Sequence, residues 1–106
     1  MLQVGGAPVN VKSIAQLYVM TAKIPEDGVE KFNEYESHVL PLLNEHGAKM
    51  ERRLQSPDRL IEIHIIWFPS SQSFENYCTD PRRNEHIYLL VESGAEIELR
   101  VMEDLK

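Results

Sequence analysis

Five side chains with chemistry to offer alternate with apolar residues in three segments that have the pattern of strands. Glu62 and His64 alternate with isoleucines in 60–68, Tyr18 lies in 14–23, and Glu98 and Arg100 lie in 95–102. Period-two spacing places alternate residues on one face, so we expect these five side chains to project the same way from adjoining strands. His64 would then be a general base near neutral pH, Tyr18 a donor to a developing oxyanion and Arg100 an anchor for a substrate carboxylate.

The same five residues also have a purely structural interpretation. Polar groups enclosed in a protein must be paired or solvated, and structural ion pairs place such residues side by side more often than catalysis does. On this alternative, Glu62, Glu98, His64 and Arg100 satisfy one another at a subunit seam. The pattern alone leaves both interpretations open.

Aromatic residues gather just after the 60–68 segment. Trp67, Phe68, Phe74 and Tyr77 could line a pocket between sheet and helices that binds a flat hydrophobic molecule, or they could fill the core. With Glu62, three of them, Trp67, Phe68 and Tyr77, are the predicted substrate-binding residues.

Residues of the types that could bind a metal are scattered along the sequence. His38 follows Glu34 by four residues, which puts both on one helical face where they could share a metal or hydrogen-bond in solvent. His46 has a helix-terminal position that suits a partial positive charge, and the single cysteine, Cys78, is typical of a small core residue. Since no close zinc-type spacing occurs, we predict no metal site and no cofactor.

Two pairs of basic residues interrupt an otherwise acidic chain. Arg52-Arg53 and Arg82-Arg83 are expected at the solvated surface or in intersubunit salt bridges, although the first pair could also meet an anionic ligand.

Turn and cap residues divide the chain into six elements. Strands are predicted at 14–23, 48–56, 60–68 and 95–102. A helix is expected from a cap at Asp27 to a stop at Gly47, with a kink at Pro41, and helical stretches are expected to begin at Ser70 and Asp80 and to end at Gly94. The helix from Asp27 carries a stripe of Val29, Phe32, Glu36, Val39 and Leu43, of which four are apolar. The charged 48–56 strand suits a sheet edge and forms a hairpin with the next strand.

The order strand, helix, strand, strand, helix, strand predicts an α+β fold, the ferredoxin-like βαββαβ arrangement, in which an antiparallel four-stranded sheet carries its helices on one face. We expect the helices to cover the apolar sets Leu17, Val19, Ile61, Ile63, Ile65, Ile97, Leu99 and Val101. The helix-free face would then carry Tyr18, Met20, Ile66, Phe68 and Met102 among Gln16, Glu62, His64, Glu98 and Arg100. A face this apolar is a liability on a monomer, so we expect a homodimer in which two such sheets pack face to face.

Composition limits the partners. The 106 residues suit one domain at 14–106, preceded by a flexible N-terminal arm at 1–13. A formal net charge of −6 disfavours nucleic acid and membrane surfaces as partners. One cysteine and no targeting segment are typical of a cytoplasmic protein.

One pattern resembles a known group. Phe68-Pro69-Ser70 is followed by Tyr77 and Asp80-Pro81, and preceded by a helix with Tyr35, Pro41 and His46-Gly47. This pattern resembles a bacterial domain-of-unknown-function family of the dimeric α+β barrel superfamily, distantly like the antibiotic-biosynthesis-type monooxygenases. The chain departs from the family at Gly47-Ala48, where a Gly-Gly pair is usual, and at Trp67, where an acidic residue is usual.

The resemblance implies a homodimer whose two sheets form a barrel, in a superfamily that includes cofactor-free monooxygenases, lactone isomerases and haem-handling enzymes. Two hypotheses follow. One is a cofactor-free enzyme, monooxygenase- or isomerase-like, that acts on a small hydrophobic metabolite beside Tyr18, His64 and Arg100. The other is a non-catalytic dimeric module that binds a ligand or another protein.

Overall fold

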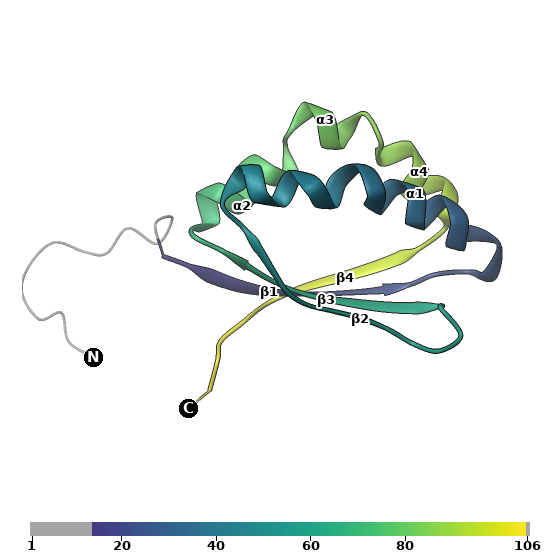
Figure 1. Ribbon diagram of the computed structural model, residues 1–106, viewed down its shortest axis with the longest axis horizontal. Helices are drawn as coiled ribbons and strands as arrows, with labels where there is room; N and C mark the ends of the chain where they lie inside the picture. The colour runs from purple at the N-terminus through teal and green to yellow at the C-terminus, as the bar shows by residue number, and fades with distance from the viewer. Residues whose placement is uncertain (1–13, 106) are drawn as a thin grey trace, which may run out of the picture.

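The computed structural model describes residues 14–105, so the predicted arm at 1–13 lies outside the described residues. Its elements follow the expected order (Figure 1). They are β1 (Gln16–Lys23), the 3-10 turn η2 (Glu26–Gly28), α1 (Val29–Val39), the 3-10 helix η3 (Leu40–His46), β2 (Lys49–Gln55), β3 (Ile61–Phe68), α2 (Ser71–Cys78), α3 (Pro81–Asn84), α4 (Ile87–Ser93) and β4 (Glu96–Met102).

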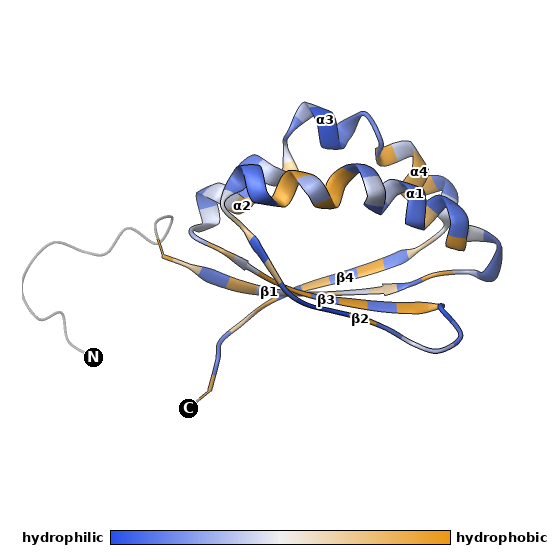
Figure 2. Ribbon diagram, in the orientation of Figure 1, coloured by the Kyte–Doolittle hydropathy of each residue, from blue (hydrophilic) through white to orange (hydrophobic). Residues whose placement is uncertain are grey.

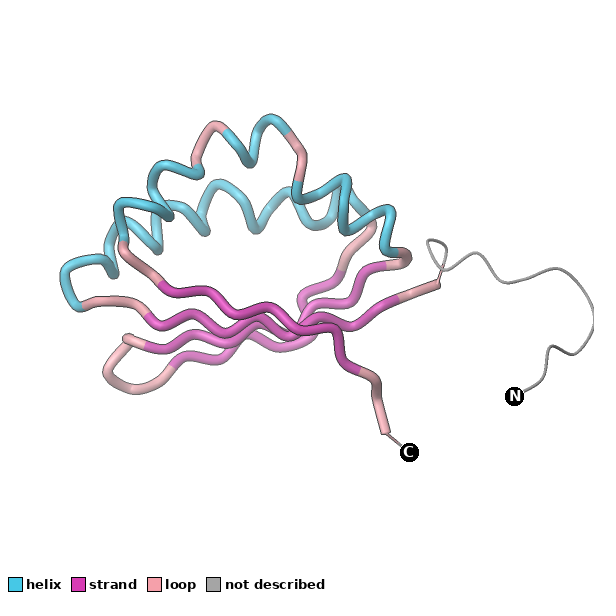
Figure 3. The backbone as a smooth tube through the Cα atoms, turned by 180° about the vertical axis from the view of Figure 1, so that it is seen from behind, coloured by secondary structure: helices cyan, strands magenta, loops and turns pink. Residues whose placement is uncertain are grey.

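The four strands form one antiparallel sheet in the order β2-β3-β1-β4. All helices lie on one side of it, as the views from front and back show (Figures 1 and 3). This arrangement confirms the predicted ferredoxin-like α+β fold. The charged strand β2 is at an edge, as expected, and pairs with β3 in a hairpin.

Most predicted helix boundaries are confirmed. Ser70 caps α2 by accepting a hydrogen bond from the Ser73 amide, and Asp80 caps α3 in the same way from the Arg82 amide. Gly47 and Gly94 each end a helix with φ of 72°, a left-handed conformation that glycine adopts without steric cost. Asp27 is not the cap that the sequence predicts, because it lies inside η2 and α1 begins after Gly28 without a side-chain cap.

Pro41 disturbs the first helix as expected. It removes the amide that would continue the α-helical ladder, and α1 ends at Val39. The chain continues without a break as η3, with Pro41 in its first turn. The two segments together span the whole length over which the sequence predicts one helix, and they present Phe32, Val39 and Leu43 to the sheet.

The face of β1 and β3 that the helices cover is the opposite of the predicted one. Tyr18, Ala22, Ile66 and Phe68, all expected on the helix-free face or left unassigned, are buried beneath the helices together with Glu62 and His64. The strand register pairs Tyr18 with Ile66 and Ala22 with Glu62 on that side. Leu17, Val19, Ile61, Ile63, Ile65 and Trp67 therefore face away from the helices.

On β4 the predicted faces are correct. Ile97, Leu99 and Val101 pair with Ala22, Met20 and Tyr18, and so lie on the helix side of the sheet. Glu98, Arg100 and Met102 lie on the helix-free side, as expected. Apolar and polar residues alternate along β3 and β4 in Figure 2. Both faces of β1 and β3 have apolar character, and the sequence analysis chose the wrong one as the face that the helices cover.

Two adjacent isoleucines test this assignment. Ile66 is 8% exposed in the core beneath the helices, whereas Ile65 points to the helix-free face. We expect Ile66→Ala to lower the free energy of unfolding by about 2–4 kcal/mol at any protein concentration, because it leaves a cavity in a packed core. Ile65→Ala should cost less in dilute solution. Urea denaturation of both variants measures the difference, and a larger loss for Ile65→Ala at the lowest concentration would contradict the observed faces.

Candidate functional site

A cavity of about 130 Å³ lies between the sheet and the helices. Its walls are mostly apolar and come from β1, β3, β4, the four α-helices and the start of η3. The apolar wall residues include Phe32, Val39, Ile66, Phe68, Phe74 and Leu90. Ile97 and Leu99 of β4 also line it and are 43% and 45% exposed, so the cavity reaches solvent along the β4 edge. An apolar cavity of about 150 Å³ can hold benzene, which sets the size of ligand that fits.

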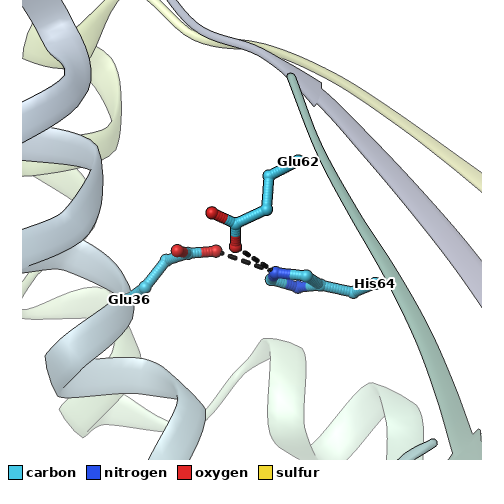
Figure 4. Close-up of side chains that lie close together, drawn as sticks. All are labelled: Glu36, Glu62 and His64. Atoms are coloured by element: carbon cyan, nitrogen blue, oxygen red, sulfur yellow. Dashed lines mark hydrogen bonds and ion pairs between the residues drawn. The ribbon is translucent and has the colours of Figure 1, made fainter. Parts of the chain in front are cut away.

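Glu36 and His64 lie on one wall of the cavity, and together with Glu62 they form a buried polar cluster (Figure 4). Glu36 reaches down from α1, and the other two residues rise from alternate positions of β3. His64 Nε2 lies 2.5 Å from Glu62 Oε2 and 3.0 Å from Glu36 Oε2. All three residues are no more than 3% exposed.

Arg53 closes the cluster from the edge strand β2. Its Nη2 donates to Glu36 Oε1 at 2.8 Å, and its Nε donates to Glu62 Oε2 at 3.1 Å. Half of the Arg53 side chain remains in solvent, so the stem spans from water to the buried carboxylates. The predicted surface role of Arg53 is therefore wrong in part, because its guanidinium neutralises two carboxylates in the core.

The cluster separates the pKa values of its two carboxyl groups. Burial raises the pKa of Glu36, and the neighbouring carboxylate of Glu62 adds to that effect. Burial acts on Glu62 as well, but hydrogen bonds with His64, Glu36 and Arg53 outweigh it and hold its pKa at about 2. Burial lowers the pKa of His64, yet its two carboxylate partners raise it more, so the net shift is upward.

The two carboxylates also differ in their hydrogen bonds to His64. One imidazole N–H cannot point at two oxygens with full strength, and here it is directed to Glu62 Oε2. Glu36 Oε2, though within ion-pair distance of the ring, has no hydrogen bond of good geometry. The site thus holds one carboxyl group with a lowered pKa beside one with a raised pKa, a division typical of acid and base pairs.

The same three side chains could hold a divalent cation. Their ligand atoms all lie within 4.8 Å of one another, and two carboxylates with one imidazole suit several transition metals. The sequence analysis predicts no metal site because it considers only close spacing along the chain. Here the third ligand, Glu36, comes from α1 and is brought to β3 by the fold.

A second polar group on the cavity wall consists of Arg83, Tyr35 and Tyr77. The Arg83 Cζ lies 4.9 Å from the ring centre of Tyr77 and 6.0 Å from that of Tyr35, so two aromatic rings hold the guanidinium. Burial raises the pKa of Tyr35, and it raises the pKa of Tyr77 to about 12. Both phenols are therefore hydrogen-bond donors at neutral pH, and Tyr77 already donates to the Val39 carbonyl at 3.2 Å.

The structure brings together most of the residues that the sequence singles out. Tyr18, His64, Phe68 and Tyr77 line the cavity, and Glu62 lies directly behind His64. Tyr18 stacks on Phe74 with ring centres 4.1 Å apart, and its hydroxyl donates to Gln16 Oε1. These residues meet on the helix side of the sheet, not on the helix-free face where the sequence analysis expects them.

Arg100 and Trp67 do not join them. Both lie on the opposite face, where Arg100 is exposed and its guanidinium pairs with Glu98 at 3.2 Å. Trp67 has the Lys49 ammonium 5.8 Å from its ring centre. The expectation that Glu98 and Arg100 project the same way as His64 is therefore wrong, since strand register places the thickness of the sheet between them.

Sequence reasoning missed Glu36, Arg53 and Arg83. A signal for Glu36 was present, because it is the one charged residue on the apolar stripe of the first helix. A charge on an otherwise buried stripe needs a buried partner. Arg83 gives no comparable signal, because the sequence does not distinguish it from its neighbour Arg82. Arg82 is an exposed arginine that pairs with Asp80 and Glu45.

The remaining histidines have local partners. His46 pairs with the Asp80 carboxylate at 2.9 Å near the end of η3, where the sequence predicts a structural role. His38 stacks on His86 with ring centres 3.8 Å apart. Cys78 is a free, partly buried thiol on the cavity wall, and burial raises its pKa.

The sequence matches no protein-family model, and no curated protein is similar to it in sequence. Solved structures do share its fold. SnoaB, a cofactor-independent oxygenase from Streptomyces nogalater, superposes with a TM-score of 0.73 at 12% identity over 88% of this chain and 95% of its own. A protein provisionally described as an antibiotic biosynthesis monooxygenase, from Caulobacter crescentus CB15, gives a TM-score of 0.74 at 7% identity over 91% and 94%.

A third structure with this fold is a nipsnap family protein of unknown function from Agrobacterium tumefaciens, with a TM-score of 0.66 at 13% identity over 85% of this chain and 87% of its own. Identities this low establish a common fold and nothing finer. The predicted likeness to ferredoxin-like proteins of the antibiotic biosynthesis monooxygenase type is thereby confirmed at the level of fold. Within the described residues, every helix is too short or too polar to cross a bilayer.

Opposite shifts in pKa predict opposite pH dependence for two variants. Folding lowers the pKa of Glu62 from 4.5 to about 2, so its contribution to stability is present above pH 4.5 and is lost as the pH falls towards 2. We expect Glu62→Gln to lower the free energy of unfolding by about 2–3 kcal/mol near pH 6, and by less near pH 3.5.

Glu36→Gln is the matched control. Folding raises the pKa of Glu36, so its contribution is present below pH 4.5 and is lost as the pH rises through the raised value. The stability of Glu36→Gln relative to the wild type should therefore improve as the pH rises. Urea titrations at several pH values measure both trends, and parallel trends for the two variants would contradict this division of charge.

Proposed function

We propose that this protein is a cofactor-free enzyme that removes a proton from a small, mostly apolar substrate held between the sheet and the helices. The observation that carries the proposal is the position of Glu36. It is a buried carboxylate with a raised pKa on the wall of an apolar cavity, and one of its oxygens lacks a well-directed hydrogen bond. Such a group is a stronger base than an ordinary carboxylate and has a free lone pair.

The neighbours of Glu36 fit this role. Arg53 holds positive charge beside the carboxylate, and His64, whose pKa its two carboxylate partners raise, lies 3.0 Å from Glu36 Oε2, while Glu62 takes the imidazole N–H and fixes the ring. A base oriented by a second and a third group is the usual arrangement of residues that transfer protons. When a substrate proton moves to Glu36 Oε2, the bond from hydrogen to carbon or oxygen breaks and its electron pair stays on the substrate as an anion.

That anion has two outcomes that need no cofactor. Returning the proton to a different atom isomerises the substrate. Alternatively, an electron-rich anion reacts with O₂, so that one oxygen atom enters the product and the other leaves as water with two substrate hydrogens. The shared fold with the cofactor-independent oxygenase SnoaB supports the second outcome by analogy.

Glu36→Gln tests the role of the base. We expect it to lower turnover by about 100-fold or more, because the amide cannot accept the proton. The substrates to screen are single-ring phenols and hydroquinones, followed with an oxygen electrode, and enolisable lactones, followed by NMR exchange of C–H for C–D. Glu34→Gln, on the exposed side of the same helix, is the matched control and should retain full activity.

Three results would contradict the proposal. Full turnover by Glu36→Gln would remove Glu36 from the chemistry. Stoichiometric binding of Zn²⁺, Mn²⁺ or Fe²⁺ that Glu36→Gln abolishes would show that the cluster holds a cation and not a proton. Binding of screened molecules without any turnover by the wild type would also count against it and favour the second candidate, a non-catalytic ligand-binding module in which Arg53 and His64 serve only to pair Glu36 and Glu62.

The proposed assembly is a homodimer through the helix-free face of the sheet. Leu17, Val19, Ile63, Ile65 and Trp67 form an apolar strip along the two central strands there, with Leu54 and Met102 exposed on the flanking strands. A second copy of the same face would remove this strip from water. In a monomer this apolar strip would be exposed to water.

Val19→Lys tests the dimer. Val19 lies at the centre of the strip opposite Ile65, so a charge there should convert the protein to a folded monomer. Val91→Lys, at a highly exposed position on α4, makes the same change outside the proposed interface and should leave association unaltered. Sedimentation velocity measures both, and a Val19→Lys variant that sediments with the wild type would contradict the interface.

A further inference from the structure

The unpartnered polar atoms of the protein point to a single ligand site. Among the described residues, three buried side-chain atoms lack a hydrogen bond of good geometry: the Tyr35 hydroxyl, Arg83 Nε and Glu36 Oε2. All three residues line the cavity between sheet and helices. Buried polar atoms are nearly always paired, so three exceptions on the wall of one cavity call for a common partner that is not part of the chain.

The types of these atoms define that partner. Tyr35 and Arg83 offer hydrogen-bond donors, and the guanidinium adds a full positive charge. Glu36 offers an acceptor. The ligand that satisfies all three carries an anionic acceptor at one end and an acidic hydrogen at the other, joined by an apolar body that suits the walls.

Arg83 is arranged as an anion site and not as part of an internal salt bridge. Every ion pair that the described residues form with one another involves other side chains. The guanidinium carbon lies 4.9 Å from the ring centre of Tyr77 and 6.0 Å from that of Tyr35, and Arg83 Nε has no hydrogen-bond partner among the described residues, so its N–H is available to a planar oxyanion. Arg83 is half-buried, and an anionic ligand offsets the cost of removing part of its charge from water.

We propose that Arg83 and Tyr35 bind the carboxylate of a ring-sized apolar acid, and that this acid is the class of substrate on which Glu36 acts. The proposal rests on the proposed function for the role of Glu36, but the anion site stands on its own geometry. Arg83 takes the anchoring role that the sequence analysis gives to Arg100. The cavity accommodates one six-membered ring, and its opening along the β4 edge admits the ligand.

Benzoate and its neutral isostere benzamide test the charge requirement. The two molecules have the same ring and nearly the same shape, so a difference in affinity reports on the anion. We expect the wild-type protein to bind benzoate at least about 10-fold more tightly than benzamide, by isothermal titration calorimetry at about pH 7. Failure to bind benzoate at about 10 mM, or equal affinity for the two molecules, overturns the proposal.

Arg83→Met should abolish the preference, because methionine fills the space of the stem without its charge. Arg52→Met removes the same charge from the far face of the sheet and should leave the preference intact. If Arg83→Met does not fold, Arg83→Lys keeps the charge but loses the planar fork, and we expect it to bind benzoate more weakly while still preferring it to benzamide. A preference that survives Arg83→Met, or one that Arg83→Lys leaves at full strength, overturns the role of Arg83.

Glu36→Gln separates this inference from the proposed function. The variant lacks the base but keeps the anion site, so it should bind benzoate at least as tightly as the wild type does. Loss of turnover with retained benzoate binding supports both proposals. Full turnover with retained binding refutes the base and leaves the anion site standing, whereas loss of the benzoate preference in Glu36→Gln refutes the anion site as located here.

Discussion

The contact between Arg53 and the two buried carboxylates determines how the sheet and its helices meet. Glu36 and Glu62 lie in a low-dielectric layer where two unneutralised negative charges would be very costly. Arg53 reaches both from the edge strand, and His64 supplies the second positive partner. Without these partners the helix layer could not cover this face of β3, and without that cover there would be no enclosed cavity.

This network also explains why the faces of β1 and β3 could not be assigned from hydropathy. The sheet has two faces with apolar character, and the more apolar one, with Ile61, Ile63 and Ile65, is not the one beneath the helices. Hydropathy compares the two faces of the sheet only by the residues that each face carries. The covered face is decided by whether its polar residues find partners. Glu36 lies on α1, far from Glu62 in sequence, and Arg53 reaches Glu62 across the β2-β3 hairpin.

Local signals in the sequence were otherwise sufficient for the architecture. Ser70, Asp80-Pro81, Gly47 and Gly94 mark helix ends through interactions with their immediate neighbours, and those ends are where the sequence places them. Tyr18 and His64 could be nominated because strand periodicity places them on one face, and Phe68 and Tyr77 because aromatic residues gather after the third strand. Glu36 and Arg83 could be recognised only once helix packing brought them to the same cavity.

The polar groups at the two ends of the cavity come from different elements of the fold. The residues of the proposed proton-transfer site come from α1 and β3, while Arg83 comes from the short α3 segment and its guanidinium lies near two tyrosine rings. The raised pKa of Glu36 depends on keeping water out, and the apolar side chains from β1, β3 and α2 do so. On the proposed function, an acid bound at Arg83 would strengthen the base at Glu36, because a ligand that fills the apolar middle of the cavity displaces the remaining solvent from both ends.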